Sequence, residues 1–527
     1  MQTKWLKYLD RRLPRYTSYP TAVQFGAGID GAACERWLTA LPIDAPVSLY
    51  LHVPFCAELC LYCGCHTTVA RRHAPVAAYA ELLEREIDLI GARLAGHTVT
   101  HLHFGGGTPT MLRPNELMRI MAALHARFRI THATEIAIEI DPRTLTREHI
   151  AALADMGVNR ASLGVQDFEP RVQEAIGRRQ SFGQTARAAD GLREAGIVHI
   201  NLDLMYGLPH QTVATVTDTA ERALALRPDR IALFGYAHVP WMKRHQKLIP
   251  EETLPGSHER FAQSRAAADV FAGSGYRHIG LDHFARAEDP LAKRQREGRL
   301  HRNFQGYTTD ETVNLIGFGP SAIGSLPGGY VQNTPHMIGY RDAIMAGRPA
   351  TVRGRAVTAE DRLRGRIIER LMCDLRGDLA DVCRAHGASA ERFAGGAFRA
   401  RRTRARRSCC AQRQRDRRAA RGASVCAVGV RGIRPIRAAT GNALFPRLLA
   451  HASFRSDLLA CRLPCRAPEP PQSPRLARLD RLGEVLILDR QRPDAFAGGR
   501  EDRVAQRRRQ RRNRRFARAA PEIAARR

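Results

Sequence analysis

The chain has 527 residues, enough for a large core and more than one domain, and a formal net charge of +31. This charge suggests a nucleic-acid partner only until its distribution is considered. Residues 401–527 hold 34 Arg, no Lys and 10 acidic residues, a net +24 that leaves an ordinary +7 for the first 400 residues. No run of about 20 apolar residues predicts a membrane-spanning helix, and the first ten residues lack the apolar stretch of a signal peptide, so we predict a cytoplasmic protein without a membrane partner.

The first 30 residues are expected to form an arm. Within them lies the segment Pro14–Ala22, PRYTSYPTA, in which two prolines flank a hydroxyl-rich stretch. Such a composition favours an extended or turning segment over a helix. By itself it could be a plain surface arm.

Four cysteines fall within ten residues directly after the apolar, β-prone run Val47–Val53. Three of them, Cys56, Cys60 and Cys63, follow C-x3-C-x2-C spacing. Thiolates are soft ligands, and three on one loop can hold three irons of a [4Fe–4S] cluster while the fourth iron stays open to a small molecule. A disulfide is disfavoured in a chain without a secretory signal. A zinc site is disfavoured because it usually needs a second cysteine pair, which is not evident.

Strand-like and helix-like segments alternate after this loop. The predicted strands are Val47–Val53, Val99–Phe104, Thr134–Ile140, Arg160–Val165, Val198–Tyr206 and Arg230–Tyr236. The predicted helices are Val76–Leu94, Asn115–Phe128, Arg147–Met156, Pro170–Ile176, Gln184–Ala195 and Val213–Leu226. This alternation predicts an α/β fold with a parallel sheet curved into a full or partial (β/α) barrel, whose functional groups lie at the carboxyl ends of the strands.

Polar and glycine-rich positions follow several of these strands. Gly105–Gly107 could let the backbone approach a ligand and present unpaired N–H groups, or could be a flexible turn. Glu139, Gln166 and Asp203 end three other strands and could converge on one polar ligand. A strand-end carboxylate is also often a helix cap or an ion-pair partner, the role that Asp141 suggests.

Taken together, these motifs resemble the radical S-adenosylmethionine (SAM) enzymes, and among them the oxygen-independent coproporphyrinogen III oxidases of haem biosynthesis. The closer resemblance depends on the Cys-Gly-Cys ending at Cys65, the arm, His52 two residues beyond Tyr50, and His301–Thr309, HRNFQGYTT. It extends from about Pro14 to about Ala388. Related haem chaperones share the first three cysteines but generally have Phe at the position of Cys65. A haem chaperone that binds haem without oxidase activity is therefore the alternative.

The resemblance implies a [4Fe–4S] cluster and two molecules of SAM as cofactors. In the family, the methionyl amine and carboxylate of SAM bind the open iron, and the reduced cluster cleaves the sulfonium to a 5′-deoxyadenosyl radical. By position, the cluster ligands would be Cys56, Cys60 and Cys63, and His52 and Cys65 would be required for turnover. Contacts to the first SAM would be Tyr50, Gly106, Glu139 and Ile323; contacts to the second would be Tyr62, Gly107, Thr108, Gln166, Arg178, Asp203 and Ala237.

The implied reaction is the oxidative decarboxylation of two propionates of coproporphyrinogen III to vinyls, which yields protoporphyrinogen IX. The radical would remove a hydrogen from the propionate β-carbon, and loss of carbon dioxide and one electron would leave the double bond. Arginines at the rim are natural clamps for the substrate carboxylates. No second cluster is suggested by the sequence, so we expect an external electron donor, and we expect a monomer.

We expect the barrel domain to span residues 31–355 and a helical C-terminal domain to begin over residues 356–395. Glu360–Leu375 reads as an amphipathic helix, with Leu363, Ile367, Ile368, Leu371 and Met372 on one face. From residue 396 to 527 the chain is Arg-rich and has little periodicity. We interpret this tail as out-of-frame translation of GC-rich DNA, which truncates the helical domain. The alternatives, which we favour less, are a native disordered extension and a nucleic-acid-binding tail.

Overall fold

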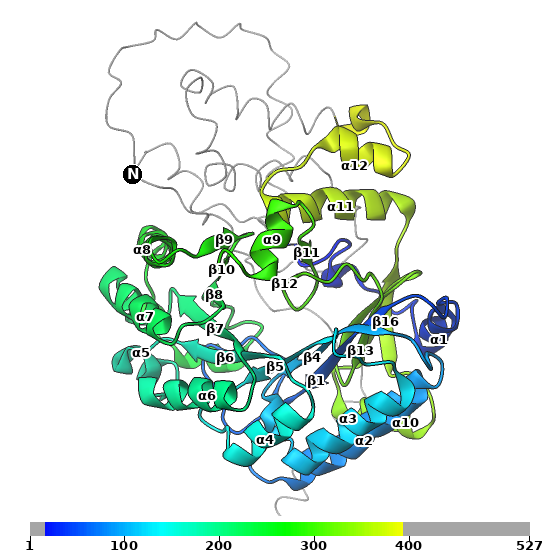
Figure 1. Ribbon diagram of the computed structural model, residues 1–527, viewed down its shortest axis with the longest axis horizontal. Helices are drawn as coiled ribbons and strands as arrows, with labels where there is room; N and C mark the ends of the chain where they lie inside the picture. The colour runs from blue at the N-terminus through cyan, green and yellow to red at the C-terminus, as the bar shows by residue number, and fades with distance from the viewer. Residues whose placement is uncertain (1–15, 394–527) are drawn as a thin grey trace, which may run out of the picture. The chain divides into compact units, whose positions relative to one another are not determined.

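The computed structural model of the protein describes residues 16–393, and its main feature is a 12-stranded sheet (Figure 1). Six consecutive neighbours in this sheet are parallel: β1 (Val47–Val53), β4 (Val99–Gly106), β5 (Glu135–Ile140), β6 (Arg160–Gln166), β7 (His199–Tyr206) and β8 (Arg230–Gly235). A further parallel strand, β13 (Leu315–Phe318), lies on the other side of β1. The predicted parallel α/β sheet is therefore confirmed.

The helices that connect these strands pack their apolar faces on the sheet and bury its outer side (Figure 1). They are α2 (Ala74–Gly91), α3 (Pro114–Arg127), α4 (Arg147–Asp155), α5 (Pro170–Ala175), α6 (Phe182–Glu194) and α7 (Val213–Ala225). Pro75 lies in the first turn of α2, where its missing N–H costs nothing. Ser181 and Gln184 form a capping box at the start of α6. All the predicted helices are confirmed, although α2 ends at Gly91 rather than Leu94.

Antiparallel strands extend the sheet at both edges. On the β13 side lie β14 (Ile323–Leu326), β15 (Gly329–Asn333) and β16 (Thr351–Ala356). On the β8 side lie β10 (His283–Ala285) and β9 (Arg277–Ile279). Because β16 and β9 are the two ends of the strand order, the sheet is open within residues 16–393, which corresponds to the partial form of the predicted barrel.

Several further elements were not predicted from the sequence. The helices among them are α1 (Gly31–Thr39), α8 (Ser257–Gly273), α9 (Pro290–Arg296) and α10 (Met337–Met345). The short strands β2 (Phe55–Cys56) and β3 (Thr68–Val69) form a parallel pair, and β11 (His301–Arg302) and β12 (Tyr307–Thr308) form a hairpin. Within the described part of the chain, no helix combines the length and the apolar character that crossing a membrane requires.

The predicted amphipathic helix after residue 356 is confirmed as α11 (Ala359–Asp374), and α12 (Leu379–Ala385) follows it. The inner face of α11 packs Ile368 and Met372 against Tyr16 and Tyr19 from the described part of the N-terminal arm. The boundaries proposed for the arm, barrel and helical domain stay predictions. The predicted out-of-frame tail lies outside the described residues.

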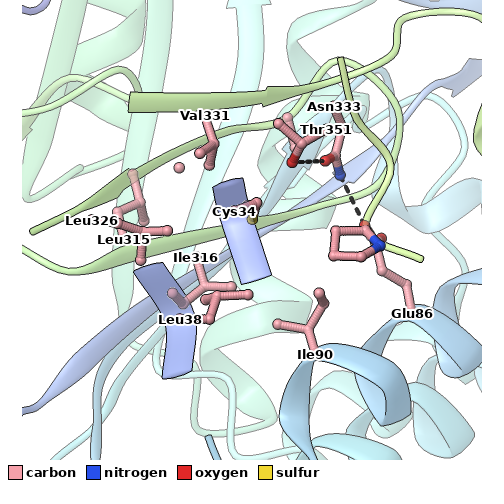
Figure 2. Close-up of a pocket in the computed structure, with 14 residues that line it drawn as sticks. Cys34, Leu38, Glu86, Ile90, Leu315, Ile316, Leu326, Val331, Asn333 and Thr351 are labelled. Carbon is pink, nitrogen blue, oxygen red and sulfur yellow. Dashed lines mark hydrogen bonds between the residues drawn. The ribbon is translucent and has the colours of Figure 1, made fainter. Parts of the chain in front are cut away.

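A buried carboxylate, Glu86, joins α2 to the turn between β13 and β14. Its Oε2 accepts hydrogen bonds from the Gly319 amide at 2.6 Å and from the Tyr340 hydroxyl at 2.7 Å, and its Oε1 accepts one from Asn333 Nδ2 at 2.8 Å. Burial raises the pKa of Glu86 to about 7, although these hydrogen bonds act in the opposite direction. Figure 2 shows a small cavity beside this carboxylate, lined mainly by the apolar side chains of Leu38, Ile90, Leu315, Ile316, Leu326 and Val331.

Candidate active site

The cysteine loop leaves the carboxyl end of β1 and returns to it through a short ladder. After β1 the chain forms β2, and the loop that follows ends in β3, which pairs in parallel with β2. Backbone hydrogen bonds from Thr68 N to Pro54 O at 2.8 Å and from Ala70 N to Cys56 O at 3.0 Å close the loop at its base. Its cysteines therefore stand on a short, defined loop at the predicted rim of the sheet.

Each of the three predicted cluster ligands receives hydrogen bonds at its sulfur. Cys56 Sγ accepts from Thr67 Oγ1 at 3.1 Å, and Cys63 Sγ accepts from the amide of Cys65 at 3.4 Å. Hydrogen bonding from Cys65 lowers the pKa of Cys63 to about 6, which favours its thiolate. Donors directed at all three sulfurs suit thiolates that bind a metal cluster.

Two guanidinium groups approach the third sulfur, Cys60 Sγ. Arg178 Nη1 lies 3.7 Å from it and Arg143 Nη2 lies 3.8 Å from it. Within residues 16–393, no three His, Cys, Asp or Glu side chains form a group that could hold a single metal ion. Cysteines that bind a four-iron cluster each take a different iron, so their sulfurs need not meet at one point.

Three side chains from one segment hold the outer half of the cysteine loop. This segment is Lys243 and the 3-10 helix Arg244–Leu248. Lys243 Nζ donates to Cys65 O at 2.8 Å, His245 Nε2 contacts Cys63 O at 2.8 Å, and Gln246 Nε2 donates to Tyr62 O at 3.0 Å. These residues were not predicted from the sequence, because nothing local to Lys243–Gln246 indicates a partner some 180 positions earlier.

The glycine loop packs directly on the cysteine strand. Gly106 adopts a φ of 113°, and a Cβ there would lie 2.7 Å from the ring of His52. A Cβ on Gly107 would lie 2.5 Å from the carbonyl oxygen of Phe55. Glycine is therefore required at both positions, at Gly106 for its backbone conformation and at both for space.

The prediction that Gly105–Gly107 present unpaired N–H groups is wrong for Gly106 and Gly107, and the amide of the next residue, Thr108, is also bonded. Gly107 N donates to Val53 O at 2.8 Å and Thr108 N donates to Phe55 O at 2.7 Å, because β1 and β4 pair in parallel register. Gly106 N donates to Glu139 Oε2 at 3.1 Å. The loop thus binds the cysteine strand and Glu139 through its amides.

Glu139 and Tyr50 meet at a third residue, His103, which the sequence analysis missed. His103 Nε2 lies 3.2 Å from Glu139 Oε1, and the Tyr50 ring stacks on the His103 ring with centroids 5.8 Å apart. Burial acts to raise the pKa of Glu139, but His103 and the Gly106 amide lower it overall, so the carboxylate is ionised. The alternation of His101 and His103 on β4 could have indicated that both face the inside of the sheet.

His52 is buried and hydrogen-bonded at both ring nitrogens. Its Nε2 lies 2.9 Å from the carbonyl oxygen of His66, so Nε2 must carry the proton, and its Nδ1 lies 3.1 Å from the Tyr50 hydroxyl. Burial lowers the pKa of His52 below its ordinary value. His52 is therefore a neutral imidazole that accepts a hydrogen bond from Tyr50.

Part of the predicted second group of ligand contacts, including Gln166 and Asp203, lies near Arg178. This buried side chain binds both oxygens of Asp141 at 3.2 Å and donates to Gly164 O at 2.7 Å, while its Nε is buried without a partner. Gln166 follows an irregularity in β6 and adopts a φ of 68°. Asp203 accepts from Ser162 Oγ at 3.2 Å, and burial, with the nearby Glu139 charge, raises the pKa of Asp203 to about 7.

The other predicted residues occupy the border of this site. Tyr62 packs against an apolar cluster that includes Ile176 and Tyr236, and Ala237 follows Tyr236 at the end of β8. Ile323 begins β14, and its carbonyl oxygen lies against Gly317, the residue paired with Tyr50. Cys65 is an exposed residue close to Cys63.

Comparison with known proteins agrees with this geometry. The sequence model of the radical SAM superfamily matches residues 50–223. An oxygen-independent coproporphyrinogen III oxidase of Bradyrhizobium diazoefficiens is 53% identical over 387 residues, which cover 73% of this chain and 86% of that protein. The enzyme of the same name from Escherichia coli K12 is 40% identical over 369 residues, which cover 70% of this chain and 80% of that protein.

A solved structure is similar over the same region. The coproporphyrinogen III oxidase of Escherichia coli, described as a radical SAM enzyme, superposes with a TM-score of 0.71 at 37% sequence identity. The match covers 74% of this chain and 90% of that one.

Proposed function

The chain belongs to the oxygen-independent coproporphyrinogen III oxidases, a family of radical SAM enzymes, and we propose that it converts coproporphyrinogen III to protoporphyrinogen IX in haem biosynthesis. The reaction is the anaerobic oxidative decarboxylation of two propionates to vinyls. The observation that carries this proposal is the hydrogen bonding of the glycine loop to the strand that leads into the three-cysteine loop, together with the bond from Gly106 to Glu139.

The residues present fit a [4Fe–4S] cluster. Cys56, Cys60 and Cys63 would hold it, since their sulfurs stand on one closed loop and all accept hydrogen bonds. Such a cluster, when bound, supplies the electron that cleaves SAM to a 5′-deoxyadenosyl radical. The chain supplies the thiolates, the donors that stabilise them and the carbonyl contacts from Lys243 and His245 that hold the loop in place.

The first SAM would lie beside Tyr50, Gly106, Glu139 and Ile323. Glu139 is ionised and faces the inside of the sheet, so it can bind the ammonium group of the methionine end. His103 holds that carboxylate and the Tyr50 ring in position. The second SAM would contact Tyr62, Gly107, Thr108, Gln166, Arg178, Asp203 and Ala237, where the free Nε of Arg178 offers a donor.

His52 and Cys65 are the two residues that we expect to be required for turnover. His52 orients the Tyr50 hydroxyl through its neutral Nδ1 and fixes the loop through His66 O. Cys65 is an exposed residue of the loop beside Cys63, and we expect it to be required for turnover of a bound substrate. An external electron donor, a monomeric state and a cytoplasmic location belong to the same proposal. The alternative of a haem chaperone gains no support from the relatives, which are named as oxidases.

The test is anaerobic reconstitution of the full-length chain with iron and sulfide, followed by reduction and addition of SAM and coproporphyrinogen III. We expect protoporphyrinogen and 5′-deoxyadenosine to appear together, and Cys65→Ser to retain the cluster but form no protoporphyrinogen. Formation of 5′-deoxyadenosine without decarboxylation would refute the assignment of coproporphyrinogen III as the substrate. A folded protein that takes up no cluster would refute the whole proposal.

A further inference from the structure

The three predicted cluster ligands differ in the charge of their hydrogen-bond donors. Cys56 Sγ accepts from the hydroxyls of Thr67 and Thr108, and Cys63 Sγ accepts from a backbone amide. Cys60 Sγ instead faces two guanidinium groups, those of Arg143 and Arg178. Only the Cys60 sulfur therefore receives charged donors among the described contacts of the three ligands.

One carboxylate holds both guanidinium groups in place. Asp141 Oδ2 lies 2.7 Å from Arg143 Nη2, and Asp141 also contacts both terminal nitrogens of Arg178 at 3.2 Å. The Arg143, Asp141 and Arg178 side chains are 12%, 10% and 7% exposed. A charged group this buried is stable only when its partners satisfy it, so the three side chains have little freedom to move.

The charges of this group do not balance without the cysteine. Two buried arginines and one buried aspartate leave an excess of one positive charge, which the thiolate of Cys60 can neutralise. Glu58 also pairs with Arg143 at 3.2 Å, but its side chain is 71% exposed, so water screens that interaction. The excess positive charge is thus directed at the sulfur.

We propose that Arg143, held by Asp141 together with Arg178, raises the reduction potential of the cluster through Cys60. Reduction adds one negative charge to the cluster, and a fixed cation with N–H groups directed at a ligand sulfur stabilises that charge. This inference rests on the proposed function. Arg178 is also assigned to the second SAM, whereas the side chain of Arg143 contacts only Cys60, Asp141 and Glu58 among the described residues. Arg143 is therefore a positioning residue suited to a test.

The experiment is an EPR-monitored redox titration of the reconstituted full-length chain without SAM. Arg143→Gln removes the charge, so we expect the cluster to be reduced at a more negative potential than in the parent. Arg143→Lys keeps the charge but loses the planar fork that reaches both Asp141 and Cys60, so we expect a smaller shift in the same direction. The matched control is Arg179→Gln, next in sequence to Arg178, whose exposed side chain pairs with exposed Glu174 and should leave the potential unchanged.

Each outcome of this titration decides the inference. If the cluster of Arg143→Gln has the same reduction potential as that of the parent, at equal iron content, the inference is overturned. If Arg143→Gln takes up no cluster, the decision passes to Arg143→Lys, where a parental potential would overturn it and a negative shift would support it. A parent chain that takes up no cluster would refute the proposed function itself, which distinguishes the two failures.

Discussion

Replacing the buried Glu86 by Gln should change how stability depends on pH. In the folded protein, burial raises the pKa of Glu86 to about 7 from an ordinary 4.5. The folded state therefore binds more protons than the unfolded state between these values. The contribution of Glu86 to stability is therefore complete below pH 4.5 and is lost as the pH rises through 7.

The size of the effect follows from the two pKa values. Between pH 5 and pH 8 the parent should lose about 2.5 kcal/mol of unfolding free energy through this one group. Glutamine stays neutral over the whole range, so Glu86→Gln should not show this loss. The substitution also turns an acceptor of the Asn333 amide into a donor, which costs a constant amount at every pH. The difference between the two pH values isolates the titration.

Urea unfolding of the parent and of Glu86→Gln at pH 5 and pH 8 provides the measurement. We expect the stability of the variant relative to the parent to increase by about 2.5 kcal/mol from the lower to the higher pH. Glu81→Gln, at an exposed position of the same helix, is the control and should follow the parent. A variant that also follows the parent at both pH values would show that Glu86 does not titrate in this range, and would refute the argument from burial.

Three further predictions concern the site. Gly106→Ala places a Cβ 2.7 Å from the His52 ring at a φ of 113°, which costs roughly 1–3 kcal/mol. If that strain is relieved by displacing the loop from the SAM site, SAM should bind about 5- to 150-fold more weakly in equilibrium dialysis, and parental affinity would contradict this. Because the pKa of Asp203 is about 7, its carboxylate is more ionised at pH 8 than at pH 6, and SAM, whose sulfonium is cationic, should bind the parent more tightly at pH 8. Asp203→Asn should remove that pH dependence. If SAM affinity changes with pH equally in the parent and the variant, the carboxylate has no such role. Cys60→Ser should lose most of its iron after reconstitution while Cys34→Ala, on α1, keeps it; equal iron contents would remove Cys60 from the ligand set.

The parallel part of the fold could be predicted because its signals are local. Each strand from Val47–Val53 to Arg230–Gly235 is a short apolar run followed by a helix, and that alternation allows few arrangements. The antiparallel extensions β9–β10 and β14–β16 were missed because they are short and show little alternation of apolar and polar residues. The state of the glycine-loop amides was wrongly predicted because it depends on the register of β4 against β1.

The same distinction between local and tertiary signals applies to the candidate site. The prediction of Cys56, Cys60 and Cys63 as cluster ligands depends on their spacing within one loop, so the sequence by itself was enough to propose them and, through them, the kind of cofactor. What surrounds each sulfur was decided only by the tertiary structure. The guanidinium groups at Cys60 come from positions 83 and 118 residues further along the chain. Two side chains so distant meet only because neighbouring parallel strands end at the same edge of the sheet, and that pairing is a property of the folded chain.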